Sequence, residues 1–422
     1  MTTRTDVCIV GGGLAGLSCA RLLARQGVAV TLLEAADDVG GRVRTDAVDG
    51  FLLDRGYQVV LTQFPELHHQ LDIAALDLER YEPGAVVRVH GRFHRVDDPR
   101  RHPARVLATA TAPVGSFADE LRLLALVVDL MRTEPRELLR RPDRTTLDAL
   151  RARGFSDKMI ERFWRPLFAG IQLDPDLEVS SRRFEVILAM LAEGGAAHPA
   201  TGVQAIPRQL AAAIPAGVIE CDAPVDRIDG TTAFLADGRK VEARALVVAT
   251  EGPAAARLLG IADPGSRAES CVYYGADAAP LPDKMVVLNG SRTGPVNNLS
   301  VISNVAPSYA PPGRALIAAV TPGPLDGGDA ELEEATRRQL RGWFGRTVDG
   351  WEHLRTYRIA HAHPDQRPGF SPKRRVRLGD GVYVCGDHRD TASTQGALYS
   401  GRRTASAVWA DLRGRAPVAS VT

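Results

Sequence analysis

Three glycines near the N-terminus have the spacing of a loop that holds a phosphate-bearing ligand. Gly11, Gly13 and Gly16 satisfy the pattern G-x-G-x-x-G. The first glycine permits a tight turn, the second lets the backbone approach a pyrophosphate, and the third lets a helix pack closely on a strand. Glu34 follows 18 residues after Gly16, where a carboxylate accepts hydrogen bonds from ribose hydroxyls. These residue types at this spacing predict a dinucleotide site.

The loop needs a strand before it and a helix after it. Residues 6–10 are β-rich, residues 17–26 repeat apolar side chains at helical spacing, and residues 28–34 are typical of a second strand. A right-handed crossover makes the two strands parallel, and the N-terminus of the helix then offers free N–H groups to the phosphates. The contacts predicted from this unit are Gly11, Gly12, Gly13, Leu14, Ala15, Gly16, Glu34 and Ala35.

Two further motifs accompany the loop. In DDVGGRVRT, the pair Gly40 and Gly41 permits another close approach to the same pyrophosphate, and Arg42 adds a charged hydrogen-bond donor. Near the C-terminus, residues 381–403 begin as a strand that leads to Gly386 and Asp387. A helix is predicted to start near Gly396 and Ala397, and its dipole would stabilise negative charge at its N-terminus.

These motifs resemble those of the flavin-containing amine oxidase superfamily, which includes monoamine oxidases, protoporphyrinogen oxidases and phytoene desaturase-like enzymes. The resemblance is specific over residues 6–60 and 381–408, and FWRPLFAGIQLDPDLEVSSRRFE is most similar to the desaturase-type bacterial members. It implies FAD, held non-covalently because no cysteine stands where monoamine oxidases attach their flavin. It also implies further cofactor contacts at Gly56, Tyr57, Gln58, Val225 and Thr250.

The order of the expected elements predicts an α/β protein with two interleaved domains. A discontinuous Rossmann-like domain that binds FAD is expected from residues 1–95, 205–265 and 375–415. An inserted α+β substrate domain is expected from residues 96–204 and 266–374, because residues 104–213 are mainly helical and strands return after them.

Candidates for the chemical step are fewer. His361 and His363 lie two residues apart on a predicted strand, so they point the same way, and a role in proton transfer competes with an ordinary solvated or hydrogen-bonded histidine. The resemblance draws attention to Lys284, since amine oxidases often hold a lysine near the flavin, but a surface lysine at a strand end is the favoured interpretation. No third ligand accompanies the histidines, so no metal is expected.

Composition limits the setting. The chain has 422 residues, a formal net charge of +1 and five cysteines without a C-x-x-C pair, so neither nucleic-acid binding, a disulfide framework nor a zinc site is indicated. No apolar run is long enough to span a membrane, and we expect a cytoplasmic protein. The segment with Arg136, Arg140, Arg141 and Arg144 leaves peripheral contact with the inner face of a membrane open. The oligomeric state cannot be read from the sequence.

The resemblance implies an FAD-dependent oxidoreductase that removes a hydride from a C–N or C–C bond of an apolar or amine-bearing small molecule. The electron acceptor would be O₂ or a quinone. A carotenoid or isoprenoid desaturase or isomerase with a quinone-type acceptor is one alternative. A non-catalytic carrier of prenyl or lipid groups with the same fold is another, although a carrier has no need of the C-terminal motif around Asp387.

Overall fold

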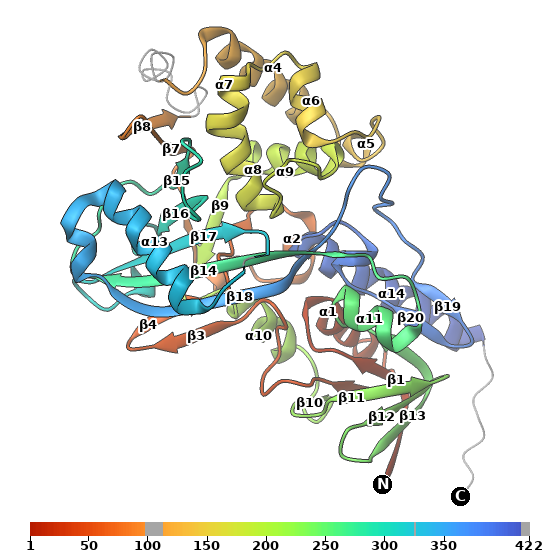
Figure 1. The fold of residues 1–422 in the computed structure, drawn as a ribbon. Coiled ribbons are helices and arrows are strands. Elements are labelled where there is room, and N and C mark those ends of the chain that lie inside the picture. Colours follow the sequence, from red (N-terminus) through yellow and green to blue (C-terminus); the bar gives the residue numbers. More distant parts are fainter. Residues whose placement is uncertain (98–112, 325, 415–422) are drawn as a thin grey trace, which may run out of the picture.

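The computed structural model describes residues 1–97, 113–324 and 326–414 (Figure 1). Within these residues, eight strands form a sheet with the order β10-β2-β1-β13-β12-β11, in which β20 also pairs with β13 and β19 pairs with β20. The strands are β1 (Thr2–Val10), β2 (Val30–Leu33), β10 (Ile219–Glu220), β11 (Val225–Asp229), β12 (Thr232–Leu235), β13 (Lys240–Val248), β19 (Arg377–Gly379) and β20 (Val382–Val384). The neighbours β10, β2, β1, β13 and β20 are parallel, as a Rossmann-like sheet requires. We call this the nucleotide sheet.

The helices near the nucleotide sheet are α1 (Leu14–Ala24), α2 (Pro65–Gln70), α10 (Ala205–Ala212), α11 (Gly252–Leu259) and α14 (Thr394–Gly414). Helices α1, α11 and α14 contact the sheet, whereas α2 packs on α14 and α10 packs on α1. The predicted β-α-β unit is confirmed, and its helix begins at Leu14, three residues before the expected start. Helix α14 packs directly on α1, and a Cβ at Gly401 would lie 2.3 Å from the carbonyl oxygen of Ala15. Segments from the two ends of the described chain therefore form one layer.

A second sheet has the order β18-β14-β17-β16-β15-β7-β8 as far as the chain is described. Its strands are β7 (Gly84–Val89), β8 (Arg92–Asp97), β14 (Ser266–Ala276), β15 (Val286–Asn289), β16 (Asn298–Val301), β17 (Ala315–Pro322) and β18 (Glu352–Pro364). Helix α13 (Asp329–Phe344) packs on one face through Leu332 and Leu340.

Strand β7, from the part of the chain expected to form the nucleotide domain, belongs to this second sheet. Residues 84–95 were expected with the nucleotide domain, but β7 pairs with β15 and so extends the second sheet. Both faces of β7 are covered. Val86 packs in the core beneath α13, whereas Val87 and Val89 pack in a larger core that also contains Leu17 and Trp164. An apolar strand of this kind does not indicate which of two sheets it joins.

The remaining elements lie between the strands and helices of these two sheets along the chain. The hairpin of β3 (Thr45–Val48) and β4 (Phe51–Asp54) precedes a small sheet of β5 (Val60–Leu61), β9 (Ala196–Pro199) and β6 (Leu78–Arg80). The connecting short helices are η1 (Ala74–Leu76), α12 (Ile302–Val305), η4 (Pro307–Tyr309), η5 (Gly345–Gly350) and η6 (Asp387–Arg389).

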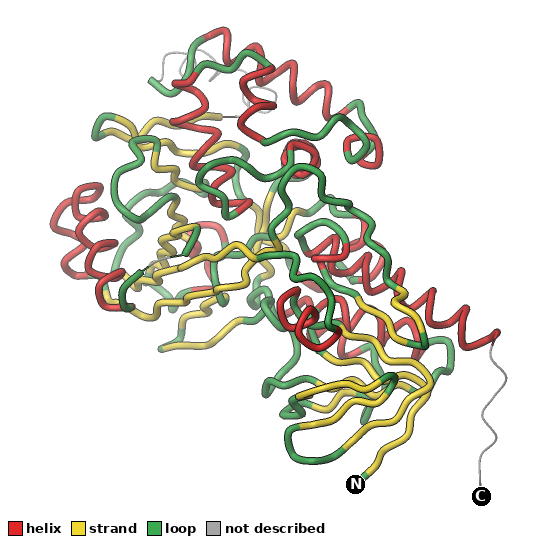
Figure 2. The backbone as a smooth tube through the Cα atoms, turned by 45° about the vertical axis from the view of Figure 1, so that its right-hand side comes forward, coloured by secondary structure: helices red, strands yellow, loops and turns green. Residues whose placement is uncertain are grey.

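The helical part of the inserted region lies beyond the second sheet, away from the nucleotide sheet (Figures 1 and 2). It contains α4 (Phe117–Met131), α5 (Pro135–Leu138), α6 (Thr146–Ala152), α7 (Asp157–Met159), the π-helix η3 (Ile160–Trp164), α8 (Arg165–Gln172) and α9 (Ser181–Glu193). The fully buried Trp164 packs against the rings of Phe155, Phe168 and Phe184 at its centre.

In the basic segment 136–144, Arg141 pairs with Asp129 and Glu185, whereas Arg136, Arg140 and Arg144 are exposed. Exposed apolar side chains occupy one face of α4, namely Phe117, Leu121, Leu124 and Met131. No helix in the described ranges has the length and apolar character needed to cross a bilayer. Peripheral contact with a membrane stays a prediction.

Candidate active site

The backbone N–H groups of the first glycine loop bind the end of β2 and the residue that follows it. The N–H of Gly11 donates to the carbonyl of Leu33 at 2.8 Å, and the N–H of Gly12 donates to Oε2 of Glu34 at 2.6 Å. Gly11 has a φ of +108°, and a Cβ at Gly16 would lie 2.0 Å from the Gly11 carbonyl oxygen. These two positions therefore require glycine for the turn and for close packing, as the motif predicted.

Gly13 is different, because it leaves a space in front of the loop. A Cβ built there would meet no heavy atom within 4 Å. Gly13 is the N-cap residue of α1, and no side chain caps this helix. An uncapped helix N-terminus beside open space is suited to an anionic group.

The second glycine pair lies against the first loop. The N–H of Gly40 donates to the carbonyl of Gly12 at 2.9 Å, and Gly40 forms a parallel bridge with Gly13. A Cβ at Gly41 would lie 3.5 Å from the Cα of Gly13. The two motifs thus form the two sides of one small cradle.

The N-terminal and C-terminal motifs meet through an ion pair. Nη2 of Arg42 lies 2.8 Å from Oδ1 of Asp387, 345 positions later in the chain, and Nη1 of Arg42 donates to the carbonyl of Ala362 at 2.7 Å. Gln58 donates to the main-chain carbonyl of Arg42 at 2.8 Å. Burial acts to raise the pKa of Asp387, but the charge and hydrogen bond of Arg42 hold this pKa below its ordinary value.

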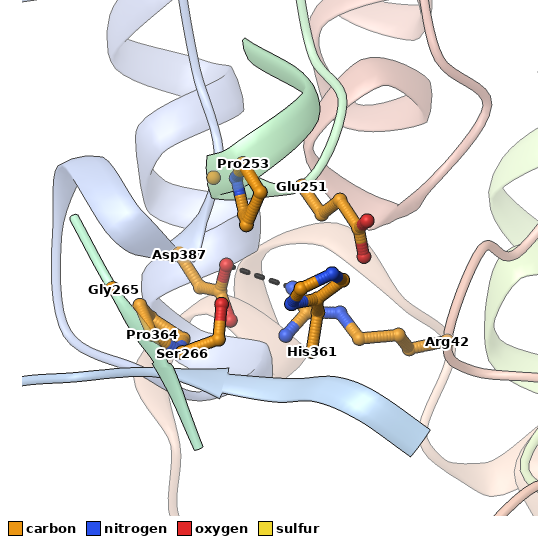
Figure 3. Close-up of a pocket in the computed structure, with 9 residues that line it drawn as sticks. Arg42, Glu251, Pro253, Gly265, Ser266, His361, Pro364 and Asp387 are labelled. Carbon is orange, nitrogen blue, oxygen red and sulfur yellow. Dashed lines mark hydrogen bonds and ion pairs between the residues drawn. The ribbon is translucent and has the colours of Figure 1, made fainter. Parts of the chain in front are cut away.

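This ion pair borders a cavity (Figure 3). The cavity is lined by Arg42, Glu251, Gly252, Pro253, Gly265, Ser266, His361, Pro364 and Asp387. Figure 3 shows the imidazole of His361 beside the guanidinium of Arg42. Within the described residues, the buried Nδ1 of His361 has no hydrogen-bond partner.

Other polar atoms around Asp387 also lack partners in the part of the chain that the structure describes. They include Nδ1 of His363, both ring nitrogens of His388, and Nε and Nη1 of Arg183. Burial lowers the pKa of His363 to about 3, and the nearby charges of Arg183 and Arg42 act in the same direction. Burial lowers the pKa of His388 to about 4. Both histidines are therefore neutral near pH 7.

Arg183 was missing from the sequence-based list. It comes from α9, is only 3% exposed, and donates through Nη2 to the carbonyl of Ala392 at 2.9 Å. Burial lowers its pKa to about 10. A single arginine in a helix carries no spacing signal, so only the fold reveals that it reaches the segment after Asp387.

The segment expected beside the flavin ring contacts a buried carboxyl group. The N–H of Tyr57 donates to Oε1 of Glu269 at 2.7 Å, and Gly56 has a φ of +89°. A Cβ at Gly56 would lie 2.5 Å from Cδ1 of Ile359. Burial raises the pKa of Glu269 to about 7. Glu269, like Arg183, has no motif around it that sequence reasoning could use.

Two other predicted contacts lie at the ends of the nucleotide strands. The N–H of Ala223, two residues before Val225, donates to the carbonyl of Glu34 at 2.9 Å. The main chain of Thr250 lies between the two glycine motifs, because a Cβ at Gly11 would lie 3.1 Å from its nitrogen and one at Gly386 would lie 3.5 Å from its oxygen.

The start of α14 differs from the expectation. The helix begins at Thr394, and the N–H groups of Gly396 and Ala397 already donate to Oγ and the carbonyl oxygen of Ser393 at 3.1 and 3.0 Å. They are therefore not the free amides that were predicted to face the ring. Ser393 is the signal that was missed, since serine is a favoured N-cap residue.

Lys284 stands apart from these groups. Its side chain is exposed just before β15, its main-chain carbonyl accepts from the N–H of Glu82 at 2.8 Å, and it does not line the cavity beside Arg42.

Comparisons with known proteins agree with this geometry. A family model described as flavin containing amine oxidoreductase matches residues 14–409. Putrescine oxidase of Kocuria rosea is 42% identical over 83 residues, which cover 19% of this chain and 17% of that protein. Coproporphyrinogen III oxidase of Mycobacterium leprae is 27% identical over 175 residues, covering 40% of this chain and 38% of that protein. Each alignment spans less than half of the relative.

Solved structures match over a greater length. A putative protoporphyrinogen oxidase from Exiguobacterium sp. 255-15 has a TM-score of 0.73 and 19% identity, covering 97% of this chain and 99% of that one. Putrescine oxidase bound to putrescine has a TM-score of 0.70 and 19% identity, covering 98% and 100%. At this identity the structures show a shared fold. Together with the match of the family model to nearly the whole chain, they establish that this protein belongs to the flavin-containing amine oxidoreductase family.

Proposed function

We propose that this protein is an FAD-dependent oxidoreductase that removes a hydride from a C–N or C–C bond of an apolar or amine-bearing small molecule. The observation that carries the proposal is the meeting of two distant motifs. The glycine cradle of Gly11–Gly16 and Gly40–Gly41 lies next to Arg42, and Arg42 pairs with Asp387 at 2.8 Å. A long ligand with a diphosphate at one end and a polar ring at the other matches this arrangement.

The residues present fit FAD. The open face at Gly13 and the uncapped N-terminus of α1 suit the pyrophosphate, and each carboxylate oxygen of Glu34 has capacity for a ribose hydroxyl beyond its present N–H donor. The unpartnered atoms of Arg183 and His388 would supply further hydrogen bonds near Asp387. When bound, the flavin supplies hydride acceptance, which no protein side chain provides.

The protein's own groups would orient the substrate and manage its proton. His363 is poorly matched to a base at pH 7, because its pKa is about 3. His361 lines the cavity and could accept a hydrogen bond there. Glu269 accepts from the N–H of Tyr57 and lies close to Gly56, and its pKa of about 7 is better matched to pH 7 than that of His363.

The first experiment asks whether the purified protein is yellow and releases all of its colour on denaturation, as non-covalent FAD requires. Anaerobic addition of putrescine or coproporphyrinogen III then asks whether the flavin is bleached. Reoxidation by O₂ or by a soluble quinone identifies the acceptor class. A protein that reduces only with a carotenoid or isoprenoid would be a desaturase or isomerase, and a colourless protein that cannot be reconstituted with FAD would support the carrier and overturn the proposal.

A further inference from the structure

Polar side chains from four segments form a chain of close contacts, of which two are hydrogen bonds. Oη of Tyr57 lies 2.9 Å from Oη of Tyr81, and Oη of Tyr81 lies 2.9 Å from Nε2 of His198. Nδ1 of His198 lies 3.7 Å from Oδ2 of Asp54. We call Tyr57, Tyr81, His198 and Asp54 the phenol–imidazole chain. No sequence motif indicates this chain, because its members come from β4, the loop after β4, the residue after β6, and β9.

The inner end of the chain is closed to solvent. His198 and Asp54 are 0% and 1% exposed, whereas Tyr57 and Tyr81 are half-buried. The imidazole lies among the rings of Tyr57, Tyr81 and Tyr309, with centroids 6.2, 5.5 and 5.2 Å away. The chain therefore leads from a partly open end at Tyr57 into the protein interior.

Asp54 is arranged as an acceptor. One oxygen accepts from Oγ1 of Thr45 at 2.7 Å and from the N–H of Val203 at 3.1 Å, and the other accepts from the hydroxyl of Tyr309 at 3.0 Å. Both oxygens of Asp54 therefore act as hydrogen-bond acceptors. It faces Nδ1 of His198, which has no hydrogen-bond partner in the described ranges. A proton on Nδ1 is therefore the favoured tautomer, and Nε2 is left to accept.

This tautomer fixes the direction of the other bonds. The hydroxyl of Tyr81 donates to Nε2 of His198 and accepts from the hydroxyls of Tyr57 and Ser300, each 2.9 Å away. These three bonds use the full capacity of the Tyr81 hydroxyl. The Ser300 hydroxyl also interacts with the oxygen of Tyr57, and this oxygen keeps the capacity to accept one further hydrogen bond from a bound molecule.

We propose that the phenol–imidazole chain takes up the proton that the substrate loses when it is oxidised. The inference rests on the proposed function. The substrate loses a hydride in the redox step and one proton to the oxygen of Tyr57. At the same time Tyr57 passes its proton to Tyr81, and Tyr81 passes its own to Nε2 of His198. The net change is one proton moved from substrate to imidazole, and Asp54 balances the new charge.

The ionisable surroundings agree with a concerted transfer. Burial raises the pKa of both Tyr57 and Tyr81, so neither phenol loses its proton alone near pH 7. The titratable groups that face His198 are Asp54, Tyr57, Tyr81 and Tyr309. Glu269 reaches only the main-chain N–H of Tyr57. A purely structural role for the chain predicts loss of stability on substitution and no change in proton transfer.

One experiment determines the direction of these hydrogen bonds without turnover of a substrate. In the FAD-loaded protein with ¹⁵N-labelled histidine, the resonances of His198 are identified by their loss in His198→Gln. We expect Nδ1 to be protonated and Nε2 to carry the shift of a hydrogen-bonded acceptor, which Tyr81→Phe moves toward the unbonded value. A proton on Nε2 would overturn the proposal, whatever the substrate proves to be.

A second experiment measures the transfer. Flavin reduction is followed by stopped flow with putrescine or coproporphyrinogen III, whichever bleaches the wild type. Tyr57→Phe and Tyr81→Phe should each slow reduction about a hundredfold and reduce its solvent isotope effect. The matched control is Tyr273→Phe, because in the described ranges that hydroxyl donates to the main-chain carbonyls of Asp54 and Gly56 and to no side chain of the phenol–imidazole chain.

The controls separate the possible failures. If Tyr57→Phe and Tyr81→Phe reduce as fast as Tyr273→Phe, the relay is wrong although the oxidoreductase stands. If the wild type binds no flavin, the proposed function fails on its own, and the NMR measurement on the apoprotein still decides the direction of the hydrogen bonds.

Discussion

The glycine cradle and the phenol–imidazole chain are built in opposite ways. The cradle uses main-chain atoms of residues close in sequence, and glycine is required where a Cβ would collide, as at Gly16. The phenol–imidazole chain uses side-chain atoms from segments between residues 54 and 198. A site made of backbone leaves a spacing pattern in the sequence, whereas a site made of side chains leaves only scattered polar residues. The comparison explains why the first could be read in advance and the second could not.

We expect the largest effect on stability and FAD binding from substitution of Gly16, and a different effect from substitution of Gly13. Gly16→Ala places a Cβ 2.0 Å from the Gly11 oxygen, so α1 must shift, and we expect loss of FAD together with about 3 kcal/mol of apoprotein stability. Gly13→Ala meets no atom, so apoprotein stability should change by less than about 0.5 kcal/mol while FAD binds at least tenfold more weakly. Denaturant unfolding and FAD titration measure the two quantities.

The control for these variants is Gly342→Ala in α13, where a Cβ also meets nothing. It should stabilise the helix by up to about 1 kcal/mol and leave FAD binding unchanged. Equal losses of stability in Gly13→Ala and Gly16→Ala would mean that the cradle has no open face.

The ion pair of Arg42 and Asp387 joins the two backbone motifs, and we expect its removal to cause the next largest loss of stability. Arg42→Met leaves Asp387 buried without its cation, which we expect to lower stability by about 3 kcal/mol, because a buried charge is left unpaired. The double variant Arg42→Met, Asp387→Asn should recover part of this loss in a double-mutant cycle. Additive losses would show that the two ends of the site are not coupled through this pair.

Glu269 gives a pH signature beside the phenol–imidazole chain. Burial raises its pKa from 4.5 to about 7, so the folded state holds this proton more tightly than the unfolded state. The stabilisation is complete below pH 4.5 and is lost as the pH rises to about 7, by on the order of 3 kcal/mol. Urea unfolding of the wild type and of Glu269→Gln measures it, and the variant should lack this component. If the wild type and Glu269→Gln lose the same free energy of unfolding over this pH range, the loss belongs to another titratable group.

The smallest effect is expected at Lys284. Because its side chain is exposed and does not line the cavity beside Arg42, Lys284→Met should change the rate of flavin reduction less than threefold, roughly the scale of ordinary surface substitutions. A loss of tenfold or more in stopped flow would restore this lysine as a catalytic candidate and would show that sequence resemblance found a side-chain site after all.

Local patterns predicted the nucleotide half well. The alternation of strand and helix around Gly11–Gly16 places the loop, and the helix begins earlier than predicted because Gly13, an extended residue, serves as N-cap. The pattern could not assign residues 84–97 to a sheet, since β7 is buried on both faces. It also could not find Arg183, His198 or Glu269, because an isolated charged or polar residue becomes informative only when the fold brings its partners close.

The packing of α14 on α1 has a consequence for biosynthesis. Ser18 in α1 donates to the carbonyl of Leu398, and Gly401 lies against Ala15, so the surface of α1 is completed by residues made almost four hundred positions later. At about 5–20 residues per second, the ribosome needs several tens of seconds to reach them. Throughout that interval the nascent glycine cradle lacks Asp387, and α1 lacks its contacts with α14. Loading of the flavin must therefore follow synthesis, and a nonsense codon shortly before residue 382 would yield a chain that never retains it.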